Sequence, residues 1–190
     1  MNRKSSLLKS GISLSVLTLV SRVLGLIREM TKSTFLGTGP LADAFTVAFM
    51  IPNLLRRIFA ENSMTVAFIP TFQTYLEDEK QNTPDAKASM KEFLSATFTM
   101  LSFAVTGTVI IGILCSGLII AVFFPKIGDF SATILLTRIM FPYLLLISIA
   151  AFFQGILNGV RSFLPTGITP ILFNLSVIGC TFVLAKPCGN

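Results

Sequence analysis

The sequence contains no histidine, no tryptophan and only three cysteines among its 190 residues, and only 13% of the residues are charged. Without histidine, and with Cys115, Cys180 and Cys188 irregularly spaced, the chain offers no zinc site, no Cys-x-x-Cys redox pair and no Cys/His or Ser/His catalytic set. A typical soluble domain carries about 25% charged residues, so this low value excludes an ordinary water-soluble globule. We therefore expect a membrane protein with no metal, no cofactor and no catalytic residues.

Hydrophobic residues make up 53% of the chain, and 18 residues are phenylalanine. A helix needs about 20 mostly apolar residues to span a bilayer. Three stretches without any charge reach that length, namely 93–125 (33 residues), 139–160 (22 residues) and 162–185 (24 residues). They predict an all-α, polytopic membrane fold with one long helix over 93–125 and two more helices within 132–185.

Residues 10–76 are apolar stretches interrupted by charges. We interpret them as two charged membrane helices, at about 10–35 and 41–76, which brings the total to about five transmembrane helices. The second of these is expected to bend near Pro52 and Pro70, because proline lacks the amide donor that continues a helix.

Basic residues in short loops predict the orientation, since they are retained on the cytoplasmic side. Seven of them fall on one side of the predicted helices: Arg3, Lys4, Lys9, Lys80, Lys87, Lys91 and Arg161. Only Lys126 and Lys186 lie outside the helices on the other side. We therefore expect the amino terminus (1–9) and the loop 77–92 in the cytoplasm, and the loop 126–131 outside.

Small residues recur at every fourth position in two of the predicted helices, at Ser21 and Gly25, and at Ala151, Gly155 and Gly159. Such stripes allow a second helix to approach closely. Asn174 lies in an apolar stretch and is expected to form a hydrogen bond across helices.

The segment 15–62 contains five cations and three acids, namely Arg22, Arg28, Lys32, Arg56 and Arg57 against Glu29, Asp43 and Glu61. An arginine at membrane depth costs about 2.5 to 3.5 kcal/mol on insertion scales, so each must face a partner, a water-filled cavity or a substrate. The surplus of two cations requires an anion. Arginine suits a phosphate because its planar fork donates two parallel hydrogen bonds and stays charged. A phosphorylated lipid headgroup is the candidate ligand.

An internal lattice of salt bridges is the alternative interpretation of these charges. It would contain the pairs Arg22–Glu29 and Arg57–Glu61, with Asp43 at the amino end of the second helix. If Arg57 and Glu61 neutralise each other, Arg56 is the freer cation.

Four motifs carry a family resemblance: Ser21-Arg-Val-Leu-Gly-Leu-Ile-Arg-Glu29, Ala42-Asp-Ala-Phe45, Ile51-Pro-Asn-Leu-Leu-Arg-Arg-Ile-Phe-Ala-Glu61 and Ala67-Phe-Ile-Pro70. They resemble the amino-terminal signature of the MurJ/MviN lipid II flippases, which belong to the multidrug, oligosaccharidyl-lipid and polysaccharide exporter superfamily. The resemblance implies two helical lobes around a central cationic cavity in the bacterial cytoplasmic membrane. The cargo it implies is lipid II, the undecaprenyl-pyrophosphate-linked peptidoglycan precursor, moved from the inner to the outer leaflet for cell wall synthesis.

The resemblance also implies roles for individual residues. Arg22, Arg28 and Arg56 would line the cavity and hold the pyrophosphate. The residues that would shape or gate the cavity are Ser21, Asp43, Asn53, Arg57 and Glu61. The implied partners are lipid II, membrane lipids and the remaining helices of a full-length protein, with no nucleic acid.

Family members continue well beyond five helices, whereas this chain ends with residues 186–190. We therefore expect it to form most of one lobe and not to transport alone, as a fragment, a truncated reading frame or one piece of an assembly. Two other functions are alternatives. One is a non-transporting scaffold or remnant with salt-bridged arginines, and the other is a related polysaccharide-lipid exporter, against which the Asn-Leu-Leu-Arg-Arg run argues.

Overall fold

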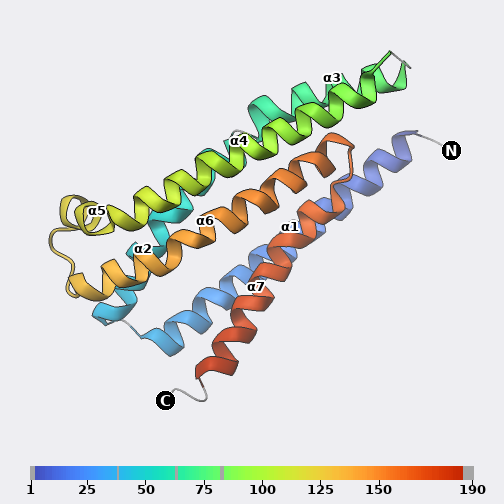
Figure 1. The fold of residues 1–190 in the computed structure, drawn as a ribbon. Coiled ribbons are helices and arrows are strands. Elements are labelled where there is room, and N and C mark those ends of the chain that lie inside the picture. Colours follow the sequence, from blue (N-terminus) through green and yellow to red (C-terminus); the bar gives the residue numbers. More distant parts are fainter. Residues whose placement is uncertain (1–2, 38, 63, 82–83, 186–190) are drawn as a thin grey trace. The chain divides into compact units, whose positions relative to one another are not determined.

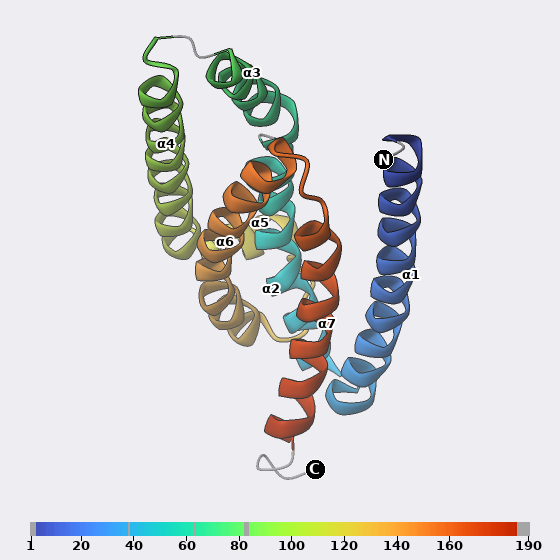
Figure 2. The same ribbon diagram turned by 90° about the vertical axis from the view of Figure 1, so that its right-hand side faces the viewer.

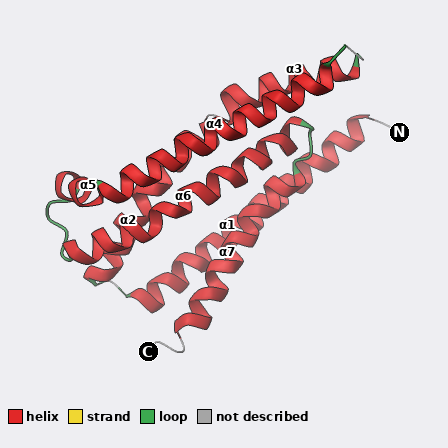
Figure 3. Ribbon diagram, in the orientation of Figure 1, coloured by secondary structure: helices red, strands yellow, loops and turns green. Residues whose placement is uncertain are grey.

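The computed structural model describes residues 3–37, 39–62, 64–81 and 84–185. All regular elements within these ranges are helices (Figures 1 and 3), which confirms the all-α fold. The elements are α1 (Arg3–Leu36), α2 (Pro40–Arg56), the π-helical segments η1 (Arg57–Asn62) and η2 (Met64–Phe68), α3 (Ile69–Lys80), α4 (Ala86–Leu114), α5 (Ser116–Phe123), α6 (Phe130–Gly159) and α7 (Leu164–Ala185).

The chain divides into two compact units, and each is described by itself. The first unit comprises residues 1–38 and 162–190, and in it α1 packs against α7. The second unit comprises residues 39–161, and in it α6 contacts every other helical element. Figure 2 shows α6 lying between α2 and α4. The second unit is therefore built around one central helix.

Local sequence signals account for several helix ends. α2 begins with Pro40 directly after Gly39, where the fixed φ and missing N–H of proline are tolerated. Asp129 caps α6, since its carboxylate accepts a hydrogen bond of 2.9 Å from the backbone N–H of Ala132. Gly37, after α1, has a φ of 67°, which glycine adopts without steric cost.

The predicted loop 77–92 is largely helical. α3 continues to Lys80 and α4 begins at Ala86, so only residues 81–85 connect the two helices. A charge-free stretch shows which part of a helix can lie in lipid, but it does not show where the helix begins. The backbone hydrogen bonds of a helix continue through turns that contain polar residues. The charge pattern therefore placed the start of this helix too late.

The single long helix expected over 93–125 is also wrong, because the structure divides it at Cys115 into α4 and α5. The hydroxyl of Ser116 donates a hydrogen bond of 2.9 Å to the backbone oxygen of Ile113. The backbone N–H of Cys115 still donates to Ile111 at 2.8 Å, and that of Ile119 donates to Cys115 at 2.9 Å, so the interruption is confined to one residue. Hydrophobicity alone does not reveal such a break.

The helix expected over 41–76 changes geometry between its two prolines. Pro52 lies inside α2 and Pro70 lies in the first turn of α3, and the described residues between Arg57 and Phe68 are π-helical. π-helical turns are rare and frequently occur at functional sites. The first of them begins at Arg57, within the cationic segment.

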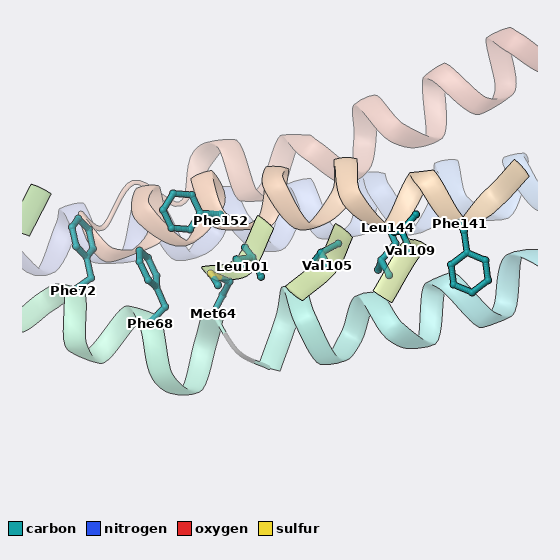
Figure 4. Packing of buried hydrophobic residues seen from close by; sticks show 9 residues of the cluster. All are labelled: Met64, Phe68, Phe72, Leu101, Val105, Val109, Phe141, Leu144 and Phe152. Atoms are coloured by element: carbon teal, nitrogen blue, oxygen red, sulfur yellow. The ribbon is translucent and has the colours of Figure 1, made fainter. Parts of the chain in front are cut away.

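A cluster of buried hydrophobic residues fills the second unit. Figure 4 shows its nine members in a row along the helices: Met64, Phe68, Phe72, Leu101, Val105, Val109, Phe141, Leu144 and Phe152. The ring of Phe68 lies 5.5 Å from that of Phe72 and 5.3 Å from that of Phe152, both measured between centroids. Aromatic packing therefore joins η2 and α3 to α6.

The stripe of small residues on α6 receives these rings. A Cβ atom added at Gly155 would lie 3.2 Å from the ring of Phe68, and one added at Gly159 would lie 2.5 Å from the ring of Phe72. The stripe was expected to admit the backbone of a second helix, but aromatic side chains fill the space over these two glycines instead. Glycine is required here because of space, since a side chain would displace the aromatic core.

Three helices among the described residues are long and apolar enough to cross a membrane: α4, α6 and residues Leu164–Val183 of α7. That α1 and α2 also span the bilayer stays a prediction. An apolar groove of about 410 Å³ lies in the second unit and is lined by residues such as Phe59, Phe93 and Met100. The lining residues among the described part of the chain carry no charge.

Candidate anion-binding site

The charged segment of α1 brings two cations to one carboxylate. An Nη2 atom of Arg28 donates to Glu29 at 2.6 Å, and the ammonium of Lys32 donates to the other oxygen of Glu29 at 3.2 Å. The Arg28 side chain is only 25% exposed, against 53% for Glu29. Residues 22–32 contain three cations and one acid, so this part of α1 attracts anions.

The helix that packs against α1 in this unit, α7, contacts α1 at both Arg28 and Ser21. The ring centroid of Phe173 lies 5.6 Å from the guanidinium carbon of Arg28. Asn174 is buried and donates a hydrogen bond of 3.0 Å to the backbone oxygen of Ser21. The bond across helices predicted for Asn174 is thus confirmed, and Ser21 takes part through its backbone.

Arg22 does not form the ion pair with Glu29 on which the salt-bridge lattice depended. Its side chain is exposed, and Glu29 is engaged with Arg28 and Lys32. Arg22 and Glu29 are seven residues, or about two helical turns, apart, whereas Arg28 is adjacent to Glu29 and Lys32 is three residues away. The nearer cations therefore take the carboxylate.

Arg56 is held by a neutral neighbour on its own helix. Its Nε atom donates to the side-chain oxygen of Asn53 at 2.9 Å, which the spacing of three residues allows. This hydrogen bond orients the guanidinium group. That Arg56 is freer than Arg57 stays a prediction, because it depends on the pair Arg57–Glu61, and the side chain of Glu61 lies outside the described part of the structure.

The other predicted site residues on α2 and η1 are Asp43, Arg57 and Glu61. Asp43 lies in the first turn of α2 and is exposed, where its charge favours the helix amino end. Arg57 begins η1 and is also exposed. The side chain of Glu61 lies outside the described part of the structure, so the pair Arg57–Glu61 stays a prediction.

The structure groups the predicted residues into two sets. Ser21, Arg22 and Arg28 belong to the unit of α1 and α7, whereas Asp43, Asn53, Arg56, Arg57 and Glu61 belong to the unit of α2 to α6. The prediction that both sets line one cavity stays a prediction. Within the described ranges no three His, Cys, Asp or Glu residues gather as a metal site would require.

Sequence reasoning did not single out Arg138 on α6. Its Nε atom donates to the hydroxyl of the fully buried Ser116 at 2.9 Å. The signal was present, because Arg138 is a lone charge in front of the apolar stretch 139–160. It lies outside the charged segment and, like Arg56, donates through Nε to a neutral side chain.

Comparison with known proteins identifies relatives over nearly the whole chain. A family model described as lipid II flippase MurJ matches residues 32–190. A protein named "Probable lipid II flippase MurJ" from Treponema pallidum (strain Nichols) is 54% identical over 184 residues, which cover 97% of this chain and 34% of that protein. One of the same name from Vibrio cholerae is 36% identical over 190 residues, covering 94% of this chain and 35% of the relative. The lipid II flippase MurJ of Burkholderia cenocepacia is 34% identical over 184 residues, covering 95% and 34%. The chain thus spans about a third of the length of these curated relatives.

Proposed function

Because this chain belongs to the MurJ lipid II flippase family, we propose that it supplies the cation-bearing helices of a lipid II flippase. The cargo is the undecaprenyl-pyrophosphate-linked peptidoglycan precursor. It moves from the inner to the outer leaflet of the bacterial cytoplasmic membrane for cell wall synthesis. The protein is a transporter in this proposal, and its action forms and breaks no covalent bond.

The observation that carries the proposal is the way the arginines are held. Arg28 shares the single carboxylate of Glu29 with Lys32, and Arg56 is oriented by the uncharged amide of Asn53. Glu29 and Asn53 therefore hold the two guanidinium groups in defined orientations. A diphosphate accepts the paired hydrogen bonds of an arginine fork, and its charge matches the excess of five cations over three acids in the segment 15–62.

This arrangement addresses the main barrier to flipping a lipid. A diphosphate loses its hydration when it enters the hydrocarbon region, where exposed charge is heavily penalised. Arginine forks replace the lost water. Export of the anion also follows the inside-negative potential, worth about 2.3 kcal/mol per charge per 100 mV.

Transport in this proposal requires helices beyond those of the present chain. Alternating access is a movement of two bodies around one binding site. We propose that Arg22, Arg28 and Arg56 contact the diphosphate, and that Ser21, Asp43, Asn53, Arg57 and Glu61 shape or gate the cavity. The remaining helices of the full-length protein are the necessary partners.

The test is a chimera in which this chain replaces the matching third of the Treponema pallidum relative, expressed in a bacterium depleted of its own flippase. Export is measured as the share of lipid II that an enzyme added outside the cells cleaves. Arg56→Ala is expected to lower export about tenfold or more, since a charge-assisted hydrogen bond contributes about 1.5 to 3 kcal/mol. Arg138→Ala is the matched control, because Arg138 also donates through Nε to a neutral side chain at 2.9 Å.

The control variant is expected to retain export. Normal export by a folded Arg56→Ala chimera contradicts the proposed role of this arginine. Equal loss in Arg56→Ala and Arg138→Ala also contradicts it, because the effect would then not be specific to the proposed site.

A further inference from the structure

The residues proposed to contact the anion lie on α1 and α2, yet α7 contacts the charged segment of α1 at two points. We propose that Phe173 and Asn174 on α7 are positioning residues that hold Arg28 for the diphosphate group of a lipid. The inference rests on the proposed function, in which Arg28 binds that diphosphate. It adds a third helix to the anion site.

Asn174 fixes where α7 lies along α1. Its side chain is 6% exposed, and its Nδ2 atom donates to the backbone oxygen of Ser21 at 3.0 Å. A Cβ atom added at Gly25, one turn further along α1, would be 3.7 Å from this same nitrogen. The close contact at Gly25 and the hydrogen bond to Ser21 therefore fix the position of α7 along α1, within two turns of Arg28.

Phe173, adjacent to Asn174, then meets the guanidinium of Arg28 at 5.6 Å. This distance falls within the range of a cation–π contact, which is stronger away from water. One edge of the guanidinium donates to Glu29 through Nη2. The Nε atom is buried and has no hydrogen-bond partner among the described residues. A buried donor without an acceptor is unfavourable, so Arg28 is held here with part of its hydrogen-bonding capacity unused.

The two partners of Arg28 respond differently to an incoming anion. Glu29 accepts hydrogen bonds from the donors that a diphosphate also needs, so the two compete. Phe173 contacts the face of the group, whereas all five N–H donors of a guanidinium lie in its plane. Phe173 therefore continues to hold the plane of the fork after the diphosphate has displaced the carboxylate.

The experiment compares two phenylalanines of α7 in the chimera described above, purified into phosphatidylcholine nanodiscs. Phe173→Leu removes the ring under Arg28. Phe182→Leu is the matched control, because the Phe182 ring packs on α1 at 5.4 Å from Phe35 and contacts no cation in the described structure. The apparent Kd for added polyprenyl diphosphate is expected to rise about fivefold in Phe173→Leu and to stay within about twofold in Phe182→Leu.

A conservative variant separates positioning from simple packing. Phe173→Tyr retains the aromatic face and is expected to restore the affinity. In an Arg28→Leu background, Phe173→Leu is expected to add no further loss, since the two residues act through one contact. Equal losses in Phe173→Leu and Phe182→Leu, or no rescue by tyrosine, overturn the inference.

The same titrations distinguish this inference from the proposed function. If Arg28→Leu binds polyprenyl diphosphate as well as the unchanged protein, the assignment of Arg28 to the anion fails. If Arg28→Leu loses binding while Phe173→Leu does not, only the role of Phe173 fails. Inorganic pyrophosphate is the second probe. A similar loss for it in Phe173→Leu places the effect on the diphosphate group, whereas a loss confined to the polyprenyl compound overturns positioning of Arg28.

Discussion

Each of the two units of this chain is stabilised internally by a different kind of contact. Among the described residues, every buried hydrophobic side chain lies within 44–152, in the unit of α2 to α6. Among the described side chains of the α1 and α7 pair, the buried ones are instead Thr31 and Asn174, which are both polar. One unit therefore has a buried aromatic core, whereas α1 and α7 are joined by a hydrogen bond, an arginine on an aromatic ring and one edge contact between Phe35 and Phe182.

The difference between the two units shows that a helix pair without a buried apolar core can carry charged residues at its interface. On α1, large apolar side chains such as Leu19, Leu26 and Met30 are more than 60% exposed. Lipid tails cover such side chains as well as protein does, so helices in a bilayer associate through close contacts and polar bonds. The α1 and α7 pair does not need its interior for an apolar core. That interface is therefore available to orient cations.

The largest expected effect concerns the aromatic core. Phe68→Ala removes a ring that packs against three others, those of Phe72, Phe93 and Phe152. We expect the free energy of unfolding, measured by SDS titration in mixed micelles, to fall by about 3 kcal/mol. Phe103→Ala on α4 is the control, because its side chain is 77% exposed and the change should matter little. Similar losses in both variants would show that this unit has no specific core.

An intermediate effect is expected from overfilling the same core. A Cβ atom added at Gly112 would overlap the ring of Phe141, which is only 1% exposed and cannot move aside freely. Gly112→Ala should therefore destabilise the protein by about 1 to 3 kcal/mol in the same assay. Gly107 on the same helix has no atom within 4 Å of an added Cβ, so Gly107→Ala is expected to be neutral or slightly stabilising. A neutral Gly112→Ala would mean that α4 and α6 pack less closely than the structure shows.

The smallest effect is expected in the first unit. Asn174→Ala removes the bond to Ser21, and hydrogen bonds between membrane helices contribute about 0.6 to 1.7 kcal/mol. Hydrogen exchange of α1 and α7 amides in nanodiscs should accelerate about fivefold, while exchange in α4 and α6 stays unchanged. Ser176→Ala, at an exposed position of α7, is the control. Faster exchange throughout the protein would contradict the separate character of the two units.

Several features could be predicted because they depend on residue type and spacing. The close contact at the glycine stripe on α6 and the cross-helix bond of Asn174 follow from small or polar residues at helical intervals in apolar surroundings, although the stripe receives aromatic rings and not a helix backbone. The break at Cys115 and the ion pairs of Glu29 could not be predicted in the same way. The break depends on the backbone geometry of a single residue, and the ion pairs depend on competition between three cations for one carboxylate.

Composition and periodicity by themselves determined that this chain is an all-helical membrane protein with more cations than acids in its first third, and its motifs determined the family. Only the tertiary structure decided which face of α1 meets α7. Helical geometry sets the angle between Arg22 and Arg28, but a partner 153 residues away, Asn174 on Ser21, selects the face that is covered. That contact brings Phe173 to Arg28 and leaves Arg22 exposed. The geometry of a helix sets the directions of its side chains relative to one another, but the packing of neighbouring helices decides which of these side chains are covered.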